Sequence, residues 1–219
     1  MRVMLLIIAC TGILSGCVST AYIHTPNDVN KMKSIVYMAD GTVKKGVLTV
    51  NFESYSSRVD IPQKNEISFV AEGDTTIQQL SITSIKSYLV DGKIYEPKII
   101  DLYFTGQGHY LFVRRMTEEK AKMQLYELYQ SYKSNDTGEE TSYYFISFPS
   151  FSSYEVAQIS SNKLVPGFEY KMSAYVADCP ELSKKIQSKE KAYYYSFTSL
   201  RYKQIEVIQR IVKEYNDCR

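Results

Sequence analysis

The 219-residue chain contains no tryptophan, only two histidines and little net charge. Its formal charge is +2 at neutral pH, and its lysines and arginines form no long run. Because nucleic-acid binding needs clustered positive charge, this balance argues against a nucleic-acid partner. The hydrophobic fraction of 44% and the charged fraction of 23% are those of an ordinary globular protein.

Recognisable catalytic motifs are missing as well. No serine lies in a nucleophile-elbow pattern, and no glycine-rich phosphate loop follows an expected strand. His24 and His109 each lack a neighbouring partner for acid–base chemistry, and the acid pairs Glu118-Glu119 and Glu139-Glu140 fit solvated loops. An enzyme would need a scattered acidic site that only the fold could assemble. The sequence therefore assigns no catalytic residue, no metal ligand and no cofactor.

Long apolar stretches are absent except at the start of the chain. Met1-Arg2 is basic, residues 3–14 are mostly apolar, and Leu14-Ser15-Gly16-Cys17 follows. This order is typical of a secretory signal. The apolar run is about a dozen residues long, whereas a membrane-spanning helix needs about 20. A retained anchor, and ordinary cleavage that leaves Cys17 a free thiol, are the alternatives.

The segment Leu14-Ser15-Gly16-Cys17 resembles the lipobox of bacterial lipoproteins. The resemblance implies that residues 1–16 are a signal peptide, that Cys17 carries diacylglycerol and a further acyl chain, and that residues 17–31 are a tether. Each buried acyl methylene contributes about 0.8 kcal/mol, so two or more chains hold a protein stably at a membrane. Residues 18–21 carry no acid, which favours an outer-membrane lipoprotein that faces the periplasm.

Cysteine is scarce, and its placement is informative. Of the four cysteines, Cys10 lies in the signal and Cys17 in the lipobox, which leaves Cys179 and Cys218. An even pair in an exported protein predicts a disulfide. It would close a loop of about 40 residues, which the chain-entropy model values at about 4 kcal/mol. Two free buried thiols are the alternative, and zinc would need more ligands than this pair offers.

The sequence of residues 32–165 predicts a β-rich domain. Short β-prone runs alternate with the turn signals Asp40-Gly41, Gly73-Asp74 and Asp91-Gly92, in which glycine accepts a positive φ. Six or seven strands are expected before residue 116. Pro97 places its neighbours at a sheet edge or a strand end. The pattern predicts antiparallel hairpins that form a sheet, or a small barrel or roll.

Residues 118–132 fit either a helix or a strand. Their apolar residues recur at helical spacing, but three tyrosines favour a strand. Residues 143–148 predict a strand that ends at Pro149. If Asn135-Asp136-Thr137-Gly138 is a turn, the segments on both sides of it are strands, and we favour that reading.

Residues 166–219 predict a helical part packed on the β domain. Phe168, Met172 and Val176 lie at helical spacing. A second helix is expected to begin with Asp178 as its cap, Pro180 in its first turn and Glu181 in a capping box. The clearest helix covers residues 200–215, with Glu206–Arg210 and Arg210–Glu214 as i,i+4 pairs. Its expected apolar stripe is Tyr202, Ile205, Ile208, Val212 and Tyr215.

Tyrosine is the one abundant functional side chain, with 20 copies. It clusters at Tyr143-Tyr144 and at Tyr193, Tyr194 and Tyr195. Tyrosine is enriched at interfaces, but it is also ordinary cross-strand packing in sheets. The second cluster lies between two expected helices. There it either folds over the helix pair or forms an exposed contact patch.

Parts of the body are similar to uncharacterised exported proteins and lipoproteins of the Bacteroidota. The resemblance spans most of residues 33–218, and the segments that carry it are Gly41-Thr42-Val43-Lys44-Lys45-Gly46, Leu125-Tyr126, Asp178-Cys179-Pro180-Glu181-Leu182 and Ile211-Val212-Lys213-Glu214-Tyr215-Asn216-Asp217-Cys218. It implies an α+β fold with a β-rich body and C-terminal helices, and it favours a strand at residues 123–132. It implies no activity.

Three functions fit these observations. The first is a non-enzymatic cell-envelope lipoprotein, held at a membrane and acting through contacts with other envelope proteins. The second is a binding module for a carbohydrate, peptide or lipid that uses the tyrosine-rich surfaces. The third is an enzyme with a scattered acidic site, which needs two carboxylates, or His109 and an acid, in one cleft.

Overall fold

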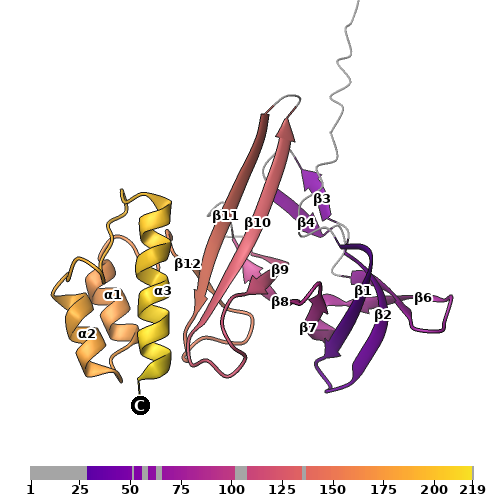
Figure 1. Cartoon of the computed structure of the whole chain (residues 1–219), viewed down its shortest axis with the longest axis horizontal. Helices are drawn as coiled ribbons and strands as arrows, with labels where there is room; N and C mark the ends of the chain where they lie inside the picture. The colour runs from indigo at the N-terminus through magenta and orange to yellow at the C-terminus, as the bar shows by residue number, and fades with distance from the viewer. Residues whose placement is uncertain are drawn as a thin grey trace, which may run out of the picture.

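The computed structural model describes residues 29–50, 52–55, 59–62, 66–101, 108–134 and 137–218. A long antiparallel sheet is followed by helices at the C-terminus, which confirms the α+β class (Figure 1). The expected lipidation site Cys17 and the signal peptide lie outside the described residues. The strands are β1 (Val29–Met38), β2 (Val43–Val50), β3 (Phe52–Tyr55), β4 (Val59–Pro62), β5 (Glu66–Ala71), β6 (Ile77–Ser81), β7 (Ile85–Val90), β8 (Lys93–Ile100), β9 (His109–Arg115), β10 (Gln124–Ser134), β11 (Thr137–Ser147) and β12 (Ala157–Gln158). The helices are α1 (Phe168–Tyr175), α2 (Pro180–Gln187) and α3 (Arg201–Asp217), with a 3₁₀ turn at Ile82–Ser84.

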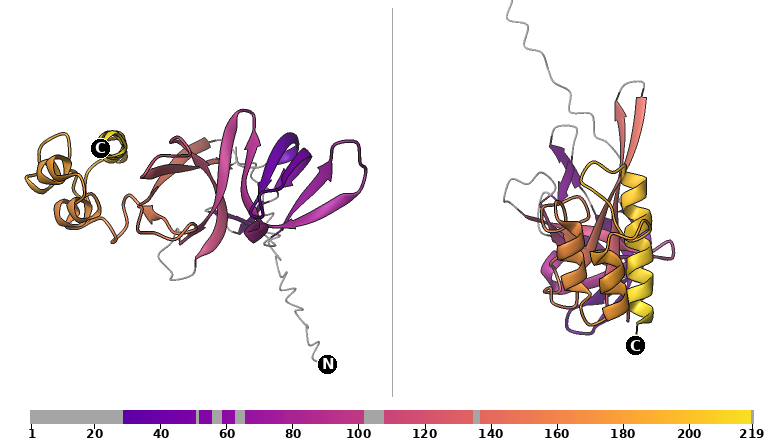
Figure 2. Two further views of the ribbon diagram at one scale, coloured as in Figure 1. Left: turned by 90° about the horizontal axis from the view of Figure 1, so that it is seen from below. Right: turned by 90° about the vertical axis from the view of Figure 1, so that its left-hand side faces the viewer.

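Ten strands form one curved sheet in the order β12-β11-β10-β9-β8-β7-β1-β2-β5-β6, and β3 pairs with β4 in a separate hairpin (Figures 1 and 2). Nine strands of the described chain end before residue 116, against six or seven expected. The additional strands include β3 and β4, whose four residues each are too few to show a period. β1 begins at Val29, so the last residues of the expected tether belong to the sheet.

The three turn signals are confirmed as hairpin turns. Gly41 and Gly73 have φ values of 87° and 82°, and Asp91 and Gly92 both have a positive φ. The Asp40 carboxylate accepts a hydrogen bond of 2.8 Å from the Thr42 amide, which closes the first turn. Two successive positive φ values match the twist of the strands that the turn joins.

The strand favoured for residues 118–132 is confirmed from Gln124 onward. β10 pairs with β11 over its whole length, from Gln124 opposite Ser147 to Ser134 opposite Thr137. The middle of the expected turn, residues 135–136, lies outside the described residues. Because β10 begins only at Gln124, the helical spacing seen in residues 118–132 does not correspond to any helix.

Pro97 lies within β8 and pairs opposite Phe112 of β9, so of the two expected positions the strand end is wrong and the sheet edge fits. The pairing of β8 with β7 ends at Tyr95, so Pro97 sits where one side of the strand has lost its neighbour. Ile99, two residues later, donates its amide to the Tyr154 carbonyl instead of to β7. Proline is tolerated here because no partner strand needs its missing N–H.

β10 and β11 contribute side chains to two separate cores. Tyr126 and Phe145 belong to the core of the sheet. Their chain neighbours Leu125 and Ile146 belong to a second core, which they share with the helices. Because consecutive residues of a strand point to opposite faces, this pair of strands separates the two cores. Figure 1 shows the helices beside β10 and β11, away from the rest of the sheet.

The start of β10 is fastened to the end of α3. Asn216 accepts a hydrogen bond from the Met123 amide at 2.9 Å and donates one to the Met123 carbonyl at 3.0 Å. A disulfide joins Cys179, just before α2, to Cys218, just after α3. It therefore closes one end of the helical part.

Two expectations for the helix termini are corrected. Pro180 is the first residue of α2, but Cys179 is the N-cap and no side chain caps the helix. The Asp178 carboxylate instead accepts a hydrogen bond of 2.8 Å from the Tyr215 hydroxyl. Burial and this contact raise the pKa of Tyr215 to about 12. Asp178 thus ties α2 to α3 instead of capping its own helix.

The buried face of α3 is rotated from the expected stripe. Tyr202 is 55% exposed, whereas Ile208, Val212 and Tyr215 are buried as expected. The face also includes residues outside the stripe, namely Gln204, Val207 and Ile211. The expected i,i+4 pairs are replaced by contacts outside the helix, because Arg210 donates to the Ala192 carbonyl and Glu214 pairs with Lys185.

Candidate functional site

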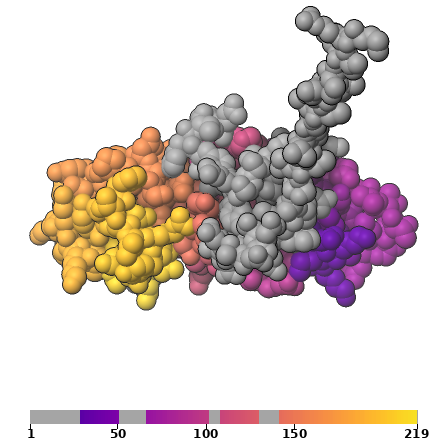
Figure 3. Space-filling view, turned by 90° about the horizontal axis from the view of Figure 1, so that it is seen from above, coloured from indigo at the N-terminus to yellow at the C-terminus, as the bar shows by residue number. Residues whose placement is uncertain are grey.

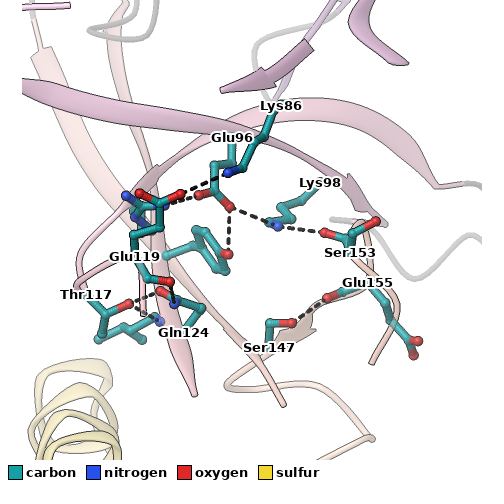
Figure 4. Close-up of polar contacts among 12 residues, drawn as sticks. Lys86, Glu96, Lys98, Thr117, Glu119, Gln124, Ser147, Ser153 and Glu155 are labelled. Atoms are coloured by element: carbon teal, nitrogen blue, oxygen red, sulfur yellow. Dashed lines mark hydrogen bonds and ion pairs between the residues drawn. The ribbon is translucent and has the colours of Figure 1, made fainter. Parts of the chain in front are cut away.

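A cluster of charged side chains lies within the sheet and was not expected from the sequence. Glu96 contacts Arg115 through one carboxylate oxygen at 2.5 Å and Lys98 through the other at 3.1 Å (Figure 4). The Tyr126 hydroxyl donates to the second oxygen at 2.9 Å. We call Glu96, Lys98, Arg115 and Tyr126 the charge cluster.

Strand pairing places these four residues together. Glu96 and Lys98 are two residues apart in β8 and therefore point to the same face. Arg115 of β9 lies directly opposite Tyr126 of β10. The side chains of Lys98, Arg115 and Glu96 are only 7%, 9% and 13% exposed. One acid and two bases are therefore largely withdrawn from water.

The groups of the charge cluster are occupied by one another. The Lys98 ammonium also donates to the Ser153 carbonyl at 2.7 Å and lies 4.7 Å from the centre of the Tyr126 ring. Burial first, and then the Glu96 carboxylate, raise the pKa of the Tyr126 hydroxyl. The hydroxyl thus stays protonated and donates. The arrangement is suited to clamping β8, β9, β10 and the segment around Ser153 together.

A cavity of about 450 Å³ lies next to the charge cluster. Its walls come from the end of β8, from β11 and from residues 152–163, and they include Ile100, Phe145, Val156 and Glu155. The Glu155 carboxylate pairs with Lys163 at 2.7 Å, and this contact lowers its pKa. His109 is exposed at the start of β9, opposite Ile100.

A second hollow of about 530 Å³ crosses β1, β2, β5 and β7. Its floor is apolar and half-buried. Its rim carries negatively charged acids and positively charged lysines. The floor consists of Ile35, Val47, Val70 and Leu89. Such a surface offers apolar contact but brings no opposed pair of catalytic groups together.

The Tyr193-Tyr194-Tyr195 segment folds over the helices, and none of its three side chains is fully exposed. Tyr195 is buried, donates to the Ile159 carbonyl at 2.6 Å and packs 4.2 Å from the Phe168 ring. Tyr193 is half-buried and donates to Glu214 at 2.6 Å. The three aromatic rings pack at the second core, where Tyr195 is a member and Tyr193 and Tyr194 lie against it.

The remaining candidates of the sequence are dispersed. Glu119 forms an exposed ion pair with Lys86, and Tyr143 lies under the Arg201 guanidinium. Arg114 faces away from Arg115 and pairs with Glu127 instead of with Glu96. The side chains of Glu139-Glu140 lie outside the described residues. The structure therefore does not gather the scattered acids into one cleft within the part of the chain that it describes.

The charge cluster could not be predicted from the sequence, because its residues come from three different strands and form no local motif. Glu96 and Lys98 flank Pro97 in a run that reads as a strand end, and Arg115 and Tyr126 lie 11 residues apart. The available signal was the charge of Glu96 and Lys98 inside an otherwise apolar strand.

Two further features are absent from the described residues. These residues hold no group of three or more His, Cys, Asp or Glu side chains placed to bind a metal ion. None of their helices has both the length and the apolar character needed to cross a membrane.

Comparison with known protein families, with curated proteins and with solved structures gives no match for this chain.

Proposed function

We propose that this chain is a lipid-anchored protein of the bacterial cell envelope that works by binding other envelope components and not by catalysis. The observation that carries the proposal is the sequence Leu14-Ser15-Gly16-Cys17 at the end of a basic and then apolar start. Cys17 would be the lipidated first residue of the mature protein. The leaflet that fits best is the periplasmic face of the outer membrane.

The body supports this proposal because the polar groups considered above form internal contacts. Glu96 has both carboxylate oxygens engaged by cluster partners, and the hydroxyls of Tyr193 and Tyr195 are spent on internal hydrogen bonds. These groups stabilise the fold and leave little of their chemistry for a substrate. An interaction protein needs a stable body and an accessible surface, and both are compatible with this use of the polar groups.

The anchor is tested by Cys17→Ser in the natural host. The unchanged chain is expected in the membrane fraction, with an intact mass that begins at Cys17 and includes acyl chains. The Cys17→Ser chain is expected to lack the acyl mass. Cys10→Ser is the matched control, because Cys10 lies in the same segment but outside the lipobox. A mature chain that begins elsewhere, or that begins at Cys17 without added mass, would reject the proposal.

The binding role is tested separately by chemical cross-linking in intact cells. The anchored protein is expected to be recovered with a specific envelope partner, whereas cells without the chain provide the background. Recovery of the anchored protein without any enriched partner would argue against an interaction protein.

A further inference from the structure

The two ends of the helical part differ in character. The disulfide Cys179–Cys218 joins the start of α2 to the end of α3, and α1 ends four residues before Cys179. The opposite end must therefore carry the start of α1, the end of α2 and the start of α3. Lys189, after α2, contacts Glu169 of α1 at 2.7 Å and lies over the Tyr194 ring, which draws these segments together. We call this the open end.

The open end carries exposed apolar side chains. Seven large hydrophobic residues of the described chain are exposed, and four of them belong to these segments. The four are Tyr170 at 66%, Phe197 at 66%, Leu200 at 59% and Tyr202 at 55%. Two tyrosines, a phenylalanine and a leucine are the residues that proteins place at a membrane–water interface.

The open end is also basic. Lys191, Arg201 and Lys203 are exposed there, against the exposed acid Glu190. The Lys203 ammonium lies 6.0 Å from the Tyr202 ring centre, so cation and aromatic ring are presented together. Basic residues beside interfacial aromatic residues favour an anionic lipid surface.

The open end and the start of β1 lie toward the same side of the molecule. In Figure 1 the start of α3 and the start of β1 point to the top of the view, as does the hairpin end of β10 and β11. Figure 3 shows the molecule from that side, with the helical part and the strands β1 and β2 toward opposite ends of its long axis. Eleven residues lie between Cys17 and Val29, and this stretch spans up to about 40 Å when extended.

We propose that the open end is a second contact with the membrane, in which Tyr170, Phe197, Leu200 and Tyr202 enter the headgroup region of an anionic phospholipid bilayer. This inference rests on the proposed function, because the acyl chains of Cys17 would bring the bilayer within reach. Lys191 and Lys203 would meet the lipid phosphates, whereas the Arg201 guanidinium already donates to the Ser142 carbonyl of β11. The body would then be held in one orientation instead of turning freely on its tether.

The absence of tryptophan makes a direct test possible. Phe197→Trp places a single reporter in the open end. Val43→Trp is the matched control, because Val43 is 52% exposed at the start of β2, at the opposite end of the β1–β2 hairpin from Val29. Both sites are exposed, so neither change disturbs a core. Each lipidated protein is reconstituted into phosphatidylethanolamine–phosphatidylglycerol vesicles that contain brominated phospholipid, which quenches tryptophan only on contact.

The Phe197→Trp reporter is expected to lose most of its fluorescence, and the Val43→Trp reporter to keep it. Adding Lys191→Glu and Lys203→Glu to the Phe197→Trp protein should restore fluorescence. An unquenched Phe197→Trp reporter, or equal quenching of the two reporters, would overturn the inference and would indicate that a protein partner or solvent covers the open end.

The intact mass of the same samples reports on the anchor independently. Acyl mass with an unquenched reporter would leave the anchor standing and reject the contact. Quenching without acyl mass would uphold the contact and reject the anchor.

Discussion

Replacing Glu96 with glutamine should destabilise the protein strongly, although the side chain keeps its shape. The substitution removes the carboxylate that contacts Lys98 at 3.1 Å and Arg115 at 2.5 Å. Both cations are less than 10% exposed and would face each other without this acid between them. Removing one partner of a buried ion pair costs about 3–5 kcal/mol, because the other charge remains buried. We expect a loss of stability in that range.

Two controls separate this effect from a general response to mutation. Lys98→Met leaves Glu96 paired with Arg115 and should cost less, about 1–3 kcal/mol, mainly for the lost hydrogen bond to the Ser153 carbonyl. Glu119→Gln removes an exposed ion pair in which both side chains are more than 60% exposed, and it should cost about 1 kcal/mol or less. The expected order of destabilisation is therefore Glu96→Gln, then Lys98→Met, then Glu119→Gln.

Urea unfolding followed by far-ultraviolet circular dichroism measures these free energies. The double variant Glu96→Gln/Lys98→Met should lose less than the sum of the single losses, because one of the two stranded cations is gone. If Glu96→Gln unfolds at the same urea concentration as Glu119→Gln, or if the double variant is additive, the charge cluster does not act as a unit and our reasoning is wrong.

Three further predictions concern the helical part. Replacing both Cys179 and Cys218 with alanine should cost about 4 kcal/mol of unfolding free energy, because the loop of 39 residues is no longer closed; a midpoint unchanged by this substitution would contradict the disulfide. Tyr195→Phe should cost about 1–3 kcal/mol in urea unfolding, since it leaves a buried carbonyl without its donor. The Lys189 ammonium lowers the pKa of Glu169, so their contact should stabilise the fold above the ordinary carboxyl range and fade as the pH falls through the lowered pKa; Glu169→Gln should flatten this acid limb in thermal unfolding at a series of pH values.

The sequence predicted those features that depend on local backbone chemistry. Gly41, Gly73 and Gly92 lie at turns because a positive φ has a cost for other residues, and that requirement is visible without any tertiary contact. Pro180 could be placed at the start of a helix for a similar reason, since the first turn needs no N–H from it. The α+β class followed from these local signals.

What the sequence could not predict depends on contacts between distant segments. Asp178 has the residue type of a helix cap, but the Tyr215 hydroxyl competes for its carboxylate across the helical part. Tyr202 matches the period of the apolar stripe, yet it lies in the first turn of α3 and is exposed. Tyr195 lies in the loop between two helices, and only the fold decides that its ring is buried against Phe168.

The coupling between the two halves bears on how a tethered body can be oriented. β10 contributes Tyr126 to the core of the sheet and Leu125 to the core of the helices, so neither core can shift without moving this strand. Asn216 holds the end of α3 to Met123 with two hydrogen bonds, and Lys122 donates to the Cys218 carbonyl. A contact made by the start of α3 is therefore transmitted to the sheet through β10. If the open end meets a bilayer, it fixes the direction in which the whole sheet faces, and the tether needs only to hold the protein close.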